Sequence, residues 1–232
     1  DKGAFYSLSL SSDNVFLASG GADSSVRIWN LQTNECAHKF TRHRGVVRGV
    51  KFKRDSLSLF SVGDDRLVCL YDIEQMNFME TLYGHTKPIM AVEALYQDRV
   101  FTCGSDATCR LWKLETESQL VFEGKKDVLS YDCLTLFDHD TIITGGQNNT
   151  VSLWSSKKRK PCDVVHNAHS SQSFAHLGTT KYGPTVQTLS HPVENWITAM
   201  HALYCTDLLI TGSSDGYLRF WKVDIRQQNI TQ

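Results

Sequence analysis

The chain has 232 residues, of which 41% are hydrophobic and 21% are charged, a composition typical of globular protein. Its 24 Lys and Arg residues nearly balance 25 Asp and Glu, so the formal charge of −1 gives no global excess that would indicate a nucleic-acid or membrane partner. The 4 prolines and 15 glycines exclude collagen-like and Pro-rich disordered chains, and no apolar run approaches the ~18 residues of a membrane span.

One short pattern recurs five times along the chain. A Ser or Thr is followed four residues later by Asp or Asn, and six residues after that by an aromatic residue. The five units span 19–29, 61–71, 102–112, 144–154 and 211–221. Their aromatic residues are 42, 41, 42 and then 67 positions apart, so the last interval holds one repeat and about 25 additional residues. This regular spacing predicts a repeat architecture.

Short alternating apolar runs surround each unit, divided by Gly, Asp, Asn and Ser, which predicts strands joined by tight turns. A unit of about 40 residues with four short strands is typical of a propeller blade, and these motifs resemble the WD-repeat family. We therefore expect an all-β β-propeller with about five blades, forming a single domain over 1–232. The resemblance implies a seven-bladed ring, so we expect further blades on one or both sides of this incomplete set.

In the WD-repeat family a hydrogen-bonded set of His, Ser or Thr, Asp and Trp locks each blade. The third unit matches all four roles with His85, Thr102, Asp106 and Trp112. The second has His43, Ser61 and Asp65 with Tyr71 in place of Trp, and the fifth can use His169, Thr211, Asp215 and Trp221. The fourth departs, with Lys125 for His and Asn148 for Asp, and the first lacks its His. We expect an incomplete lock in the fourth unit.

Catalysis has little support in the sequence. Ser, His and Asp recur in every unit at fixed spacing, whereas a catalytic triad needs one constellation. Phosphate-binding, zinc-protease and nucleophile-elbow motifs are absent from the sequence, and the seven cysteines contain no C-x-x-C pair. We expect no enzyme activity, no cofactor, no metal, no small-molecule substrate and no membrane partner.

Two basic clusters are stronger candidates for a functional site. The first contains Arg42, Arg44 and Arg48 and flanks the predicted lock residue His43. The second is the run Lys157, Lys158, Arg159 and Lys160, in a surface turn after the fourth unit. Clustered cations in a nearly neutral protein are candidates for contact with RNA phosphates. The alternatives are a solvated rim for the first cluster, and a solvated loop or a nuclear localisation signal for the second.

A polar insertion at about 170–190 is rich in Gly, Ser and Thr and has no periodicity. It predicts a long loop on one blade, which is either disordered or a partner contact. Its candidate contact residues are Phe174, Lys181 and Tyr182.

Three stretches outside the repeat scaffold resemble a narrower group, the WD-repeat subunits specific to the U-three small nucleolar ribonucleoprotein. They are Glu117–Phe122, Ser155–Pro161, and Trp196 together with Ala202–Leu208. This resemblance implies a non-catalytic nucleolar protein that binds a box C/D small nucleolar RNA with its kink-turn-binding protein. It also implies other small-subunit processome proteins as partners, and a role in precursor ribosomal RNA processing and small ribosomal subunit biogenesis.

A different class of function stays open at this point. The same scaffold serves as a general protein-interaction platform, for example as the substrate receptor of a ubiquitin ligase. The two classes differ in salt dependence, because RNA affinity falls steeply with salt and peptide affinity need not.

Overall fold

The structure is a computed structural model that describes residues 3–94, 98–124, 128–138, 140–169, 195–203, 206–225 and 227–231. Every regular element in these ranges is a β-strand, and the strands form five four-stranded antiparallel sheets. The described residues contain no helix long and apolar enough to cross a membrane.

Each sheet, called a blade below, takes four consecutive strands in chain order. Blade 1 consists of β1 (Phe5–Leu10), β2 (Phe16–Gly21), β3 (Val26–Asn30) and β4 (Glu35–Phe40). Blade 2 consists of β5 (Val47–Phe52), β6 (Ser58–Gly63), β7 (Leu67–Asp72) and β8 (Asn77–Tyr83). Blade 3 consists of β9 (Ile89–Ala94), β10 (Arg99–Gly104), β11 (Thr108–Lys113) and β12 (Ser118–Glu123). Blade 4 consists of β13 (Tyr131–Leu136), β14 (Thr141–Gly146), β15 (Val151–Ser155) and β16 (Asp163–Val165). Blade 5 consists of β17 (Ile197–Ala202), β18 (Leu208–Ser213), β19 (Leu218–Asp224) and β20 (Asn229–Thr231).

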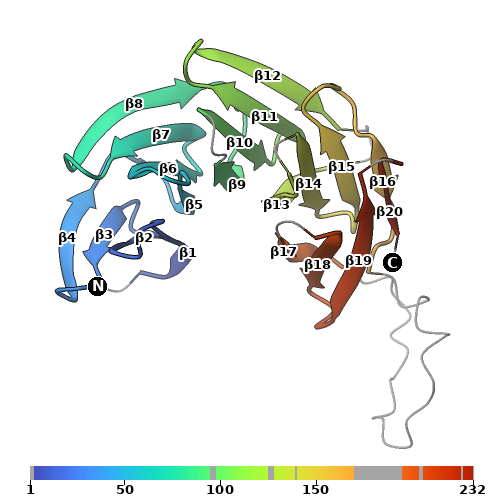
Figure 1. Ribbon diagram of the computed structural model, residues 1–232, viewed down its shortest axis with the longest axis horizontal. Helices are drawn as coiled ribbons and strands as arrows, with labels where there is room; N and C mark the ends of the chain where they lie inside the picture. The colour runs from blue at the N-terminus through green and yellow to red at the C-terminus, as the bar shows by residue number, and fades with distance from the viewer. Residues whose placement is uncertain are drawn as a thin grey trace, which may run out of the picture.

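The blades stand side by side in an open arc, with the first strand of each on the inside and the fourth on the outside (Figure 1). Neighbouring first strands run parallel. Ser7 Oγ accepts a hydrogen bond from the backbone N–H of Val50, and Ser9 Oγ accepts one from Phe52, both offset by 43 residues. Because all blades therefore point the same way, corresponding loops of different blades lie on the same face of the arc.

The core lies between blades rather than within them, in four apolar clusters for five blades. In the cluster between blades 3 and 4, for example, Phe101 and Phe122 of blade 3 pack with Trp154 of blade 4. The side chain of Trp154 meets the ring of Phe122 edge-on, at 6.1 Å between ring centroids. Each blade therefore depends on its neighbours to bury its apolar faces.

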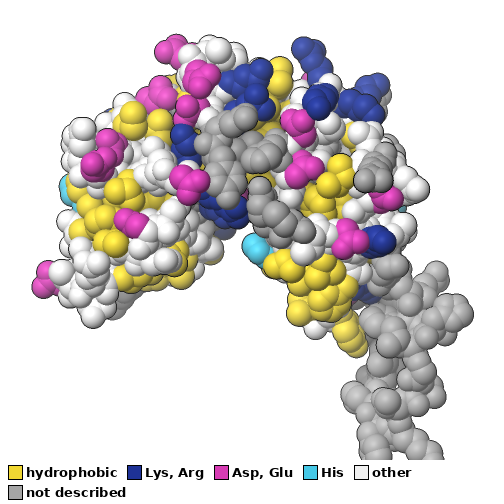
Figure 2. All heavy atoms as spheres, viewed as in Figure 1, with side chains coloured by type: hydrophobic (Ala, Val, Ile, Leu, Met, Phe, Trp, Pro, Cys, Tyr) yellow, Lys and Arg dark blue, Asp and Glu magenta, His cyan; other side chains and the backbone are white. Residues whose placement is uncertain are grey.

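The two ends of the arc expose apolar side chains. In β1, Leu8 and Leu10 are 62% and 47% exposed, and in β19 Leu218 and Phe220 are 67% and 57% exposed. Figure 2 shows hydrophobic side chains gathered at both ends of the arc. No other blade covers these faces in the part of the chain that the structure describes. Faces of this kind favour association between chains.

We therefore expect the 232-residue chain to self-associate in solution. Replacing Leu8 and Leu218 with serine should weaken that association by about ten-fold or more, because two exposed leucines no longer need to be removed from water. Sedimentation velocity over a concentration series measures the change. The matched control replaces Leu31 and Leu129, exposed leucines away from β1 and β19. If both pairs of substitutions weaken the association equally, the exposed faces of β1 and β19 are not the surfaces that associate.

Candidate functional site

A repeated turn joins the second and third strands of every blade. Its Asp or Asn is followed by a residue with positive φ, between 57° and 79° in the five blades: Ser24, Arg66, Ala107, Asn149 and Gly216. In blades 1, 2, 3 and 5 the carboxylate accepts a hydrogen bond from the backbone N–H two residues on. This short-range bond is why Asp or Asn suits the position.

Steric contact explains why glycine occupies the position before the turn. A Cβ on Gly63 would lie 2.4 Å from the carbonyl oxygen of Val46, and a Cβ on Gly104 would lie 2.7 Å from that of Pro88. These carbonyls accept hydrogen bonds from the next residues, Asp64 and Ser105, both at 2.9 Å. The close approach that ties the first strand to the turn therefore excludes larger residues there.

Blade 3 holds the complete four-residue lock that the repeat pattern indicated. His85 Nδ1 lies 2.9 Å from Asp106 Oδ2, and His85 Nε2 lies 2.8 Å from Thr102 Oγ1. The indole N–H of Trp112 donates to the same Thr102 oxygen at 2.9 Å. Burial alone would raise the pKa of Asp106, but the bonds from His85, Thr108 and the Thr86 backbone outweigh it and hold this pKa well below its usual range.

Blade 2 builds the lock with Tyr71 in place of Trp. His43 Nδ1 lies 2.9 Å from Asp65 and its Nε2 lies 2.6 Å from Ser61 Oγ. The Tyr71 hydroxyl lies 3.4 Å from Ser61 Oγ, so it reaches the position that Trp occupies elsewhere, at a longer distance. Burial disfavours the charged form of His43, yet the Asp65 bond and the nearby Cys69 outweigh it and raise the pKa of His43 to about 9.

Blade 5 has the same geometry with a different balance of charge. His169 Nδ1 lies 3.0 Å from Asp215 Oδ2, His169 Nε2 lies 2.7 Å from Thr211 Oγ1, and the Trp221 indole donates to Thr211 at 2.9 Å. Burial lowers the pKa of His169, and the bond to Asp215 acts in the opposite direction. The positive charge of Arg219, whose Nη2 lies 3.6 Å from Asp215, lowers this pKa further, so the pKa of His169 is lowered overall.

The pKa values of His43 and His169 should be shifted in opposite directions. His43 is stabilised as a cation, so its contribution to stability is full below about pH 6.5 and is lost as pH rises through about 9. His169 favours the neutral ring, so its contribution is lost as pH falls below its usual range. NMR of the imidazole Cε1–H resonances from about pH 5 to about pH 10.5, a range that extends above the usual His pKa, measures both. Coincident titration of the two rings would contradict the assignment.

Blades 1 and 4 keep only part of the lock. Trp29 donates to Ser19 and Trp154 donates to Thr144, both at 2.9 Å. Lys125, which replaces His in blade 4, lies outside the described residues. In the same blade the fully buried Tyr131 packs edge-on against Trp154, and its hydroxyl oxygen lies 2.3 Å from where a Cβ of Gly124 would be.

The repeated His, Ser or Thr, and Asp side chains thus bond to one another and stabilise each blade. The described residues bring no group of three His, Cys, Asp or Glu side chains together that could hold a metal ion. Cys36 is exposed, while Cys69, Cys103, Cys109 and Cys133 are buried free thiols. The exposed charged side chains therefore form the candidate functional surface.

The first basic cluster surrounds the β6–β7 turn. Arg44 is exposed, its backbone N–H donates to Asp65 at 3.0 Å, and its side chain has no partner within the described ranges. Arg42 stacks over the ring of Phe78, 4.5 Å from the centroid. Arg48 makes two hydrogen bonds to Asp64, at 2.8 and 3.0 Å, which compensate its charge. Among the described residues, neither Arg42 nor Arg44 has an acidic partner for its side chain, although Arg42 contacts the Phe78 ring.

Two further cations lie on the same face and were missed by the sequence analysis. Arg66 is exposed at the tip of the β6–β7 turn, and Lys87 is exposed in the β8–β9 connection. Arg66 follows the motif residue Asp65, and Lys87 follows His85 by two positions, so the repeat register could have located both. We call this side, where the His–Asp pairs lie, the lock face.

The second basic cluster lies in the β15–β16 connection, and all four of its side chains are exposed. Lys157 Nζ forms an ion pair with Asp140 at 2.9 Å, and Lys158 Nζ donates to Gln228 at 2.7 Å. Arg159 and Lys160 have no partner in the described part of the chain. This loop joins the third and fourth strands, so it is at the opposite end of the blade from the lock turn. The two basic clusters therefore lie on opposite faces.

The predicted partner loop cannot be placed. Phe174, Lys181 and Tyr182, like the whole insertion at 170–190, lie outside the described residues.

Comparison with known proteins gives a consistent result. The family model described as "WD domain, G-beta repeat" matches residues 2–30, 34–72, 76–113 and 183–222. The human "U3 small nucleolar RNA-interacting protein 2" is 33% identical over 216 residues, covering 93% of this chain but 42% of the human protein. This chain thus spans less than half of that relative.

Two solved structures have the same fold and similar sequences. "Structure of U3-55K" superposes with a TM-score of 0.83, and "Crystal structure of RRP9 WD40 repeats" with 0.84. Each is 31% identical to this chain, covering 97% of it and 64% of the solved chain. The predicted all-β propeller of the WD-repeat type is thereby confirmed, and so is the predicted resemblance to proteins of the U3 particle.

Proposed function

This chain belongs to the WD40 repeat family, and we propose that within this family it is a non-catalytic subunit of a box C/D small nucleolar ribonucleoprotein. In this role it binds RNA and protein during precursor ribosomal RNA processing and small ribosomal subunit biogenesis. The observation that carries the proposal is its 31% identity over 97% of its length to propellers titled U3-55K and RRP9.

The proposed mechanism combines charge with shape. Arg42 and Arg44 on the lock face, with the neighbouring Arg66 and Lys87, offer cations to RNA phosphates. These cations sit on short loops held by the locks of blades 2 and 3, so little ordering entropy is lost when they bind. Folded RNA is recognised mainly by shape and by contacts with its backbone, which suits a rigid rim.

The proposed partners are a box C/D small nucleolar RNA with its kink-turn-binding protein, and other small-subunit processome proteins. The proposed location is the nucleolus within the nucleus. Support comes from the names of the relatives, which include "Ribosomal RNA-processing protein 9" of Saccharomyces cerevisiae, 27% identical over 259 residues.

A general protein-interaction scaffold is the second candidate function. It is favoured by the internal pairing of three of the seven candidate cations, since Arg48, Lys157 and Lys158 already have partners. Cations that are paired within the chain have less to gain from RNA phosphates.

Filter binding over a salt series separates the two candidates. The chain is titrated onto a transcribed box C/D RNA carrying its kink-turn-binding protein, with an unrelated structured RNA of equal length as the control. We expect tighter binding to the box C/D complex and a steep fall in affinity between about 50 and 200 mM salt. Equal binding to both RNAs would overturn the proposal in favour of the scaffold.

A further inference from the structure

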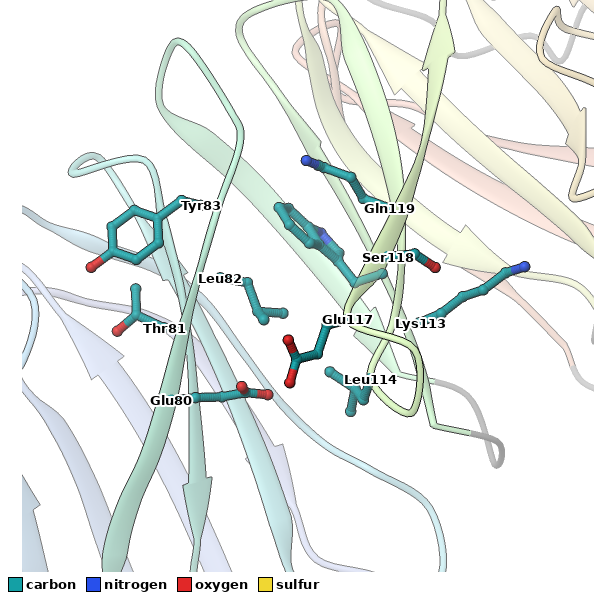
Figure 3. Close-up of a pocket in the computed structure, with 10 residues that line it drawn as sticks. Glu80, Thr81, Leu82, Tyr83, Lys113, Leu114, Glu117, Ser118 and Gln119 are labelled. Atoms are coloured by element: carbon teal, nitrogen blue, oxygen red, sulfur yellow. The ribbon is translucent and has the colours of Figure 1, made fainter.

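A groove runs along the outer wall between blades 2 and 3 (Figure 3). It has a volume of about 280 Å³, and its walls are the end of β8 and the hairpin that joins β11 to β12. Leu82, Leu114 and the indole of Trp112 line its apolar part. Trp112 also belongs to the blade 3 lock, whereas none of the proposed RNA contacts lines the groove.

The charged side chains in the groove are predominantly acidic. Glu80 from β8 and Glu117 from the β11–β12 turn point toward one another across it, while the ammonium group of Lys113 points away (Figure 3). Neither carboxylate forms an ion pair with a residue that the structure describes. Figure 2 shows both acidic and basic side chains along the outer edge where β8 and β12 meet. Two neighbouring carboxylates without a cation favour a positively charged occupant.

The walls also offer backbone and amide groups. β8 is the outermost strand of its sheet and pairs only with β7 among the described strands, so its other edge is open. Four consecutive β8 residues, Glu80–Tyr83, line the groove. On the opposite wall the Gln119 oxygen accepts a hydrogen bond from Arg110 at 2.7 Å, and the Gln119 amide nitrogen points across the groove. An open strand edge beside a groove suits an extended peptide.

We propose that this groove binds an extended segment of a partner protein through a Lys or Arg side chain. The cationic head lies between Glu80 and Glu117, and its aliphatic stem packs on Leu82 and Leu114. The peptide backbone pairs with the open edge of β8. The two carboxylates disfavour a nucleic-acid occupant, because they would repel its phosphates. The small volume fits one or two side chains of a strand and excludes a folded domain.

The test uses the full chain and a phage-displayed library of random peptides of about twelve residues. Peptides are selected on the wild-type chain, and those that also bind E80Q/E117Q are discarded. Because this variant still has the apolar ends of the arc, this step removes peptides that bind at those ends. We expect the enriched peptides to share a Lys or Arg between apolar residues. By fluorescence anisotropy they should bind E80Q/E117Q about ten-fold more weakly, as expected for the loss of charge-assisted hydrogen bonds.

The matched control is E115Q/E123Q, which removes the same charge from exposed positions outside the groove on blade 3. Its affinity for the peptides should stay within about two-fold of wild type. Hydrogen exchange gives an independent readout, because a bound strand should protect the amides of β8. The proposal is overturned if no basic peptide is enriched, if both variants bind the peptides equally, or if a single-stranded RNA occupies the groove instead. RNA binding by the lock face should be unchanged in E80Q/E117Q, so failure here leaves the proposed function standing.

Discussion

Replacing Asp106 with alanine should lower the free energy of unfolding by about 3 kcal/mol, the largest effect expected from any single change in the locks. Asp106 accepts hydrogen bonds from His85, from the backbone and hydroxyl of Thr108, and from the backbone of Thr86. Alanine removes this acceptor and leaves Nδ1 of the fully buried His85 ring without its partner, while Nε2 keeps Thr102. The loss of a buried partner costs more than the bond itself contributes.

The matched substitution is Asn148→Ala in blade 4, where the same position accepts a bond from Thr150 at 2.8 Å and no His–Asp pair is described. It should cost about 1 kcal/mol, the value of an ordinary neutral hydrogen bond. Chemical denaturation monitored by tryptophan fluorescence measures both variants. Equal penalties at the two positions would contradict the unequal completeness of the locks.

Neutralising the unpaired cations should weaken RNA binding more than neutralising the paired ones. On the lock face, Arg44→Ala removes a cation whose side chain has no partner among the described residues, whereas Arg48→Ala removes one already held by Asp64. In the β15–β16 loop, R159A/K160A removes two free cations, and K157A/K158A removes two that are bound to Asp140 and Gln228. Each true phosphate contact that is lost should flatten the log–log salt slope by ~0.7–0.9.

This design gives each basic cluster a control of the same charge within the same cluster. Exposed charges alter stability by about 0.5 kcal/mol or less, so thermal melting should be nearly unchanged in Arg44→Ala and in the two double variants. Arg48 is half-buried and bonded to Asp64, so the RNA affinity of Arg48→Ala is compared after its folding has been checked. Because the clusters lie on opposite faces, the two loops report on separate surfaces. If the free and the paired cations of both loops can be removed with RNA affinity and salt slope intact, the basic-surface mechanism is wrong and protein contacts must hold the particle together.

The repeat register allowed much of the fold to be predicted. A fixed interval from Ser or Thr to Asp and on to the aromatic residue marks the second strand, the turn and the third strand, because each of these residues makes a bond that requires it at that place. The same register identified His85 and His169, even though the 170–190 insertion separates His169 from Asp215. Local hydrogen bonds of this kind leave a visible trace in sequence.

The surfaces were less accessible to prediction. The separation of Arg44 from Arg159 depends on the alternating direction of the strands, which residue type does not reveal. The partners Asp64 and Asp140 come from neighbouring strands or loops, so compensation of charge was visible only in three dimensions. The acidic groove unites Glu80 and Glu117 from different blades, and neither belongs to a motif.

Ultraviolet crosslinking of the full-length protein to RNA in cells, followed by sequencing and by mapping of the crosslinked peptides, tests the proposed RNA-binding role. We expect a box C/D small nucleolar RNA to dominate the crosslinked RNA, and the crosslinked peptides to include Arg44 or Arg159. If no small nucleolar RNA is enriched from a protein that is folded and assembled with its protein partners, the proposed role is wrong.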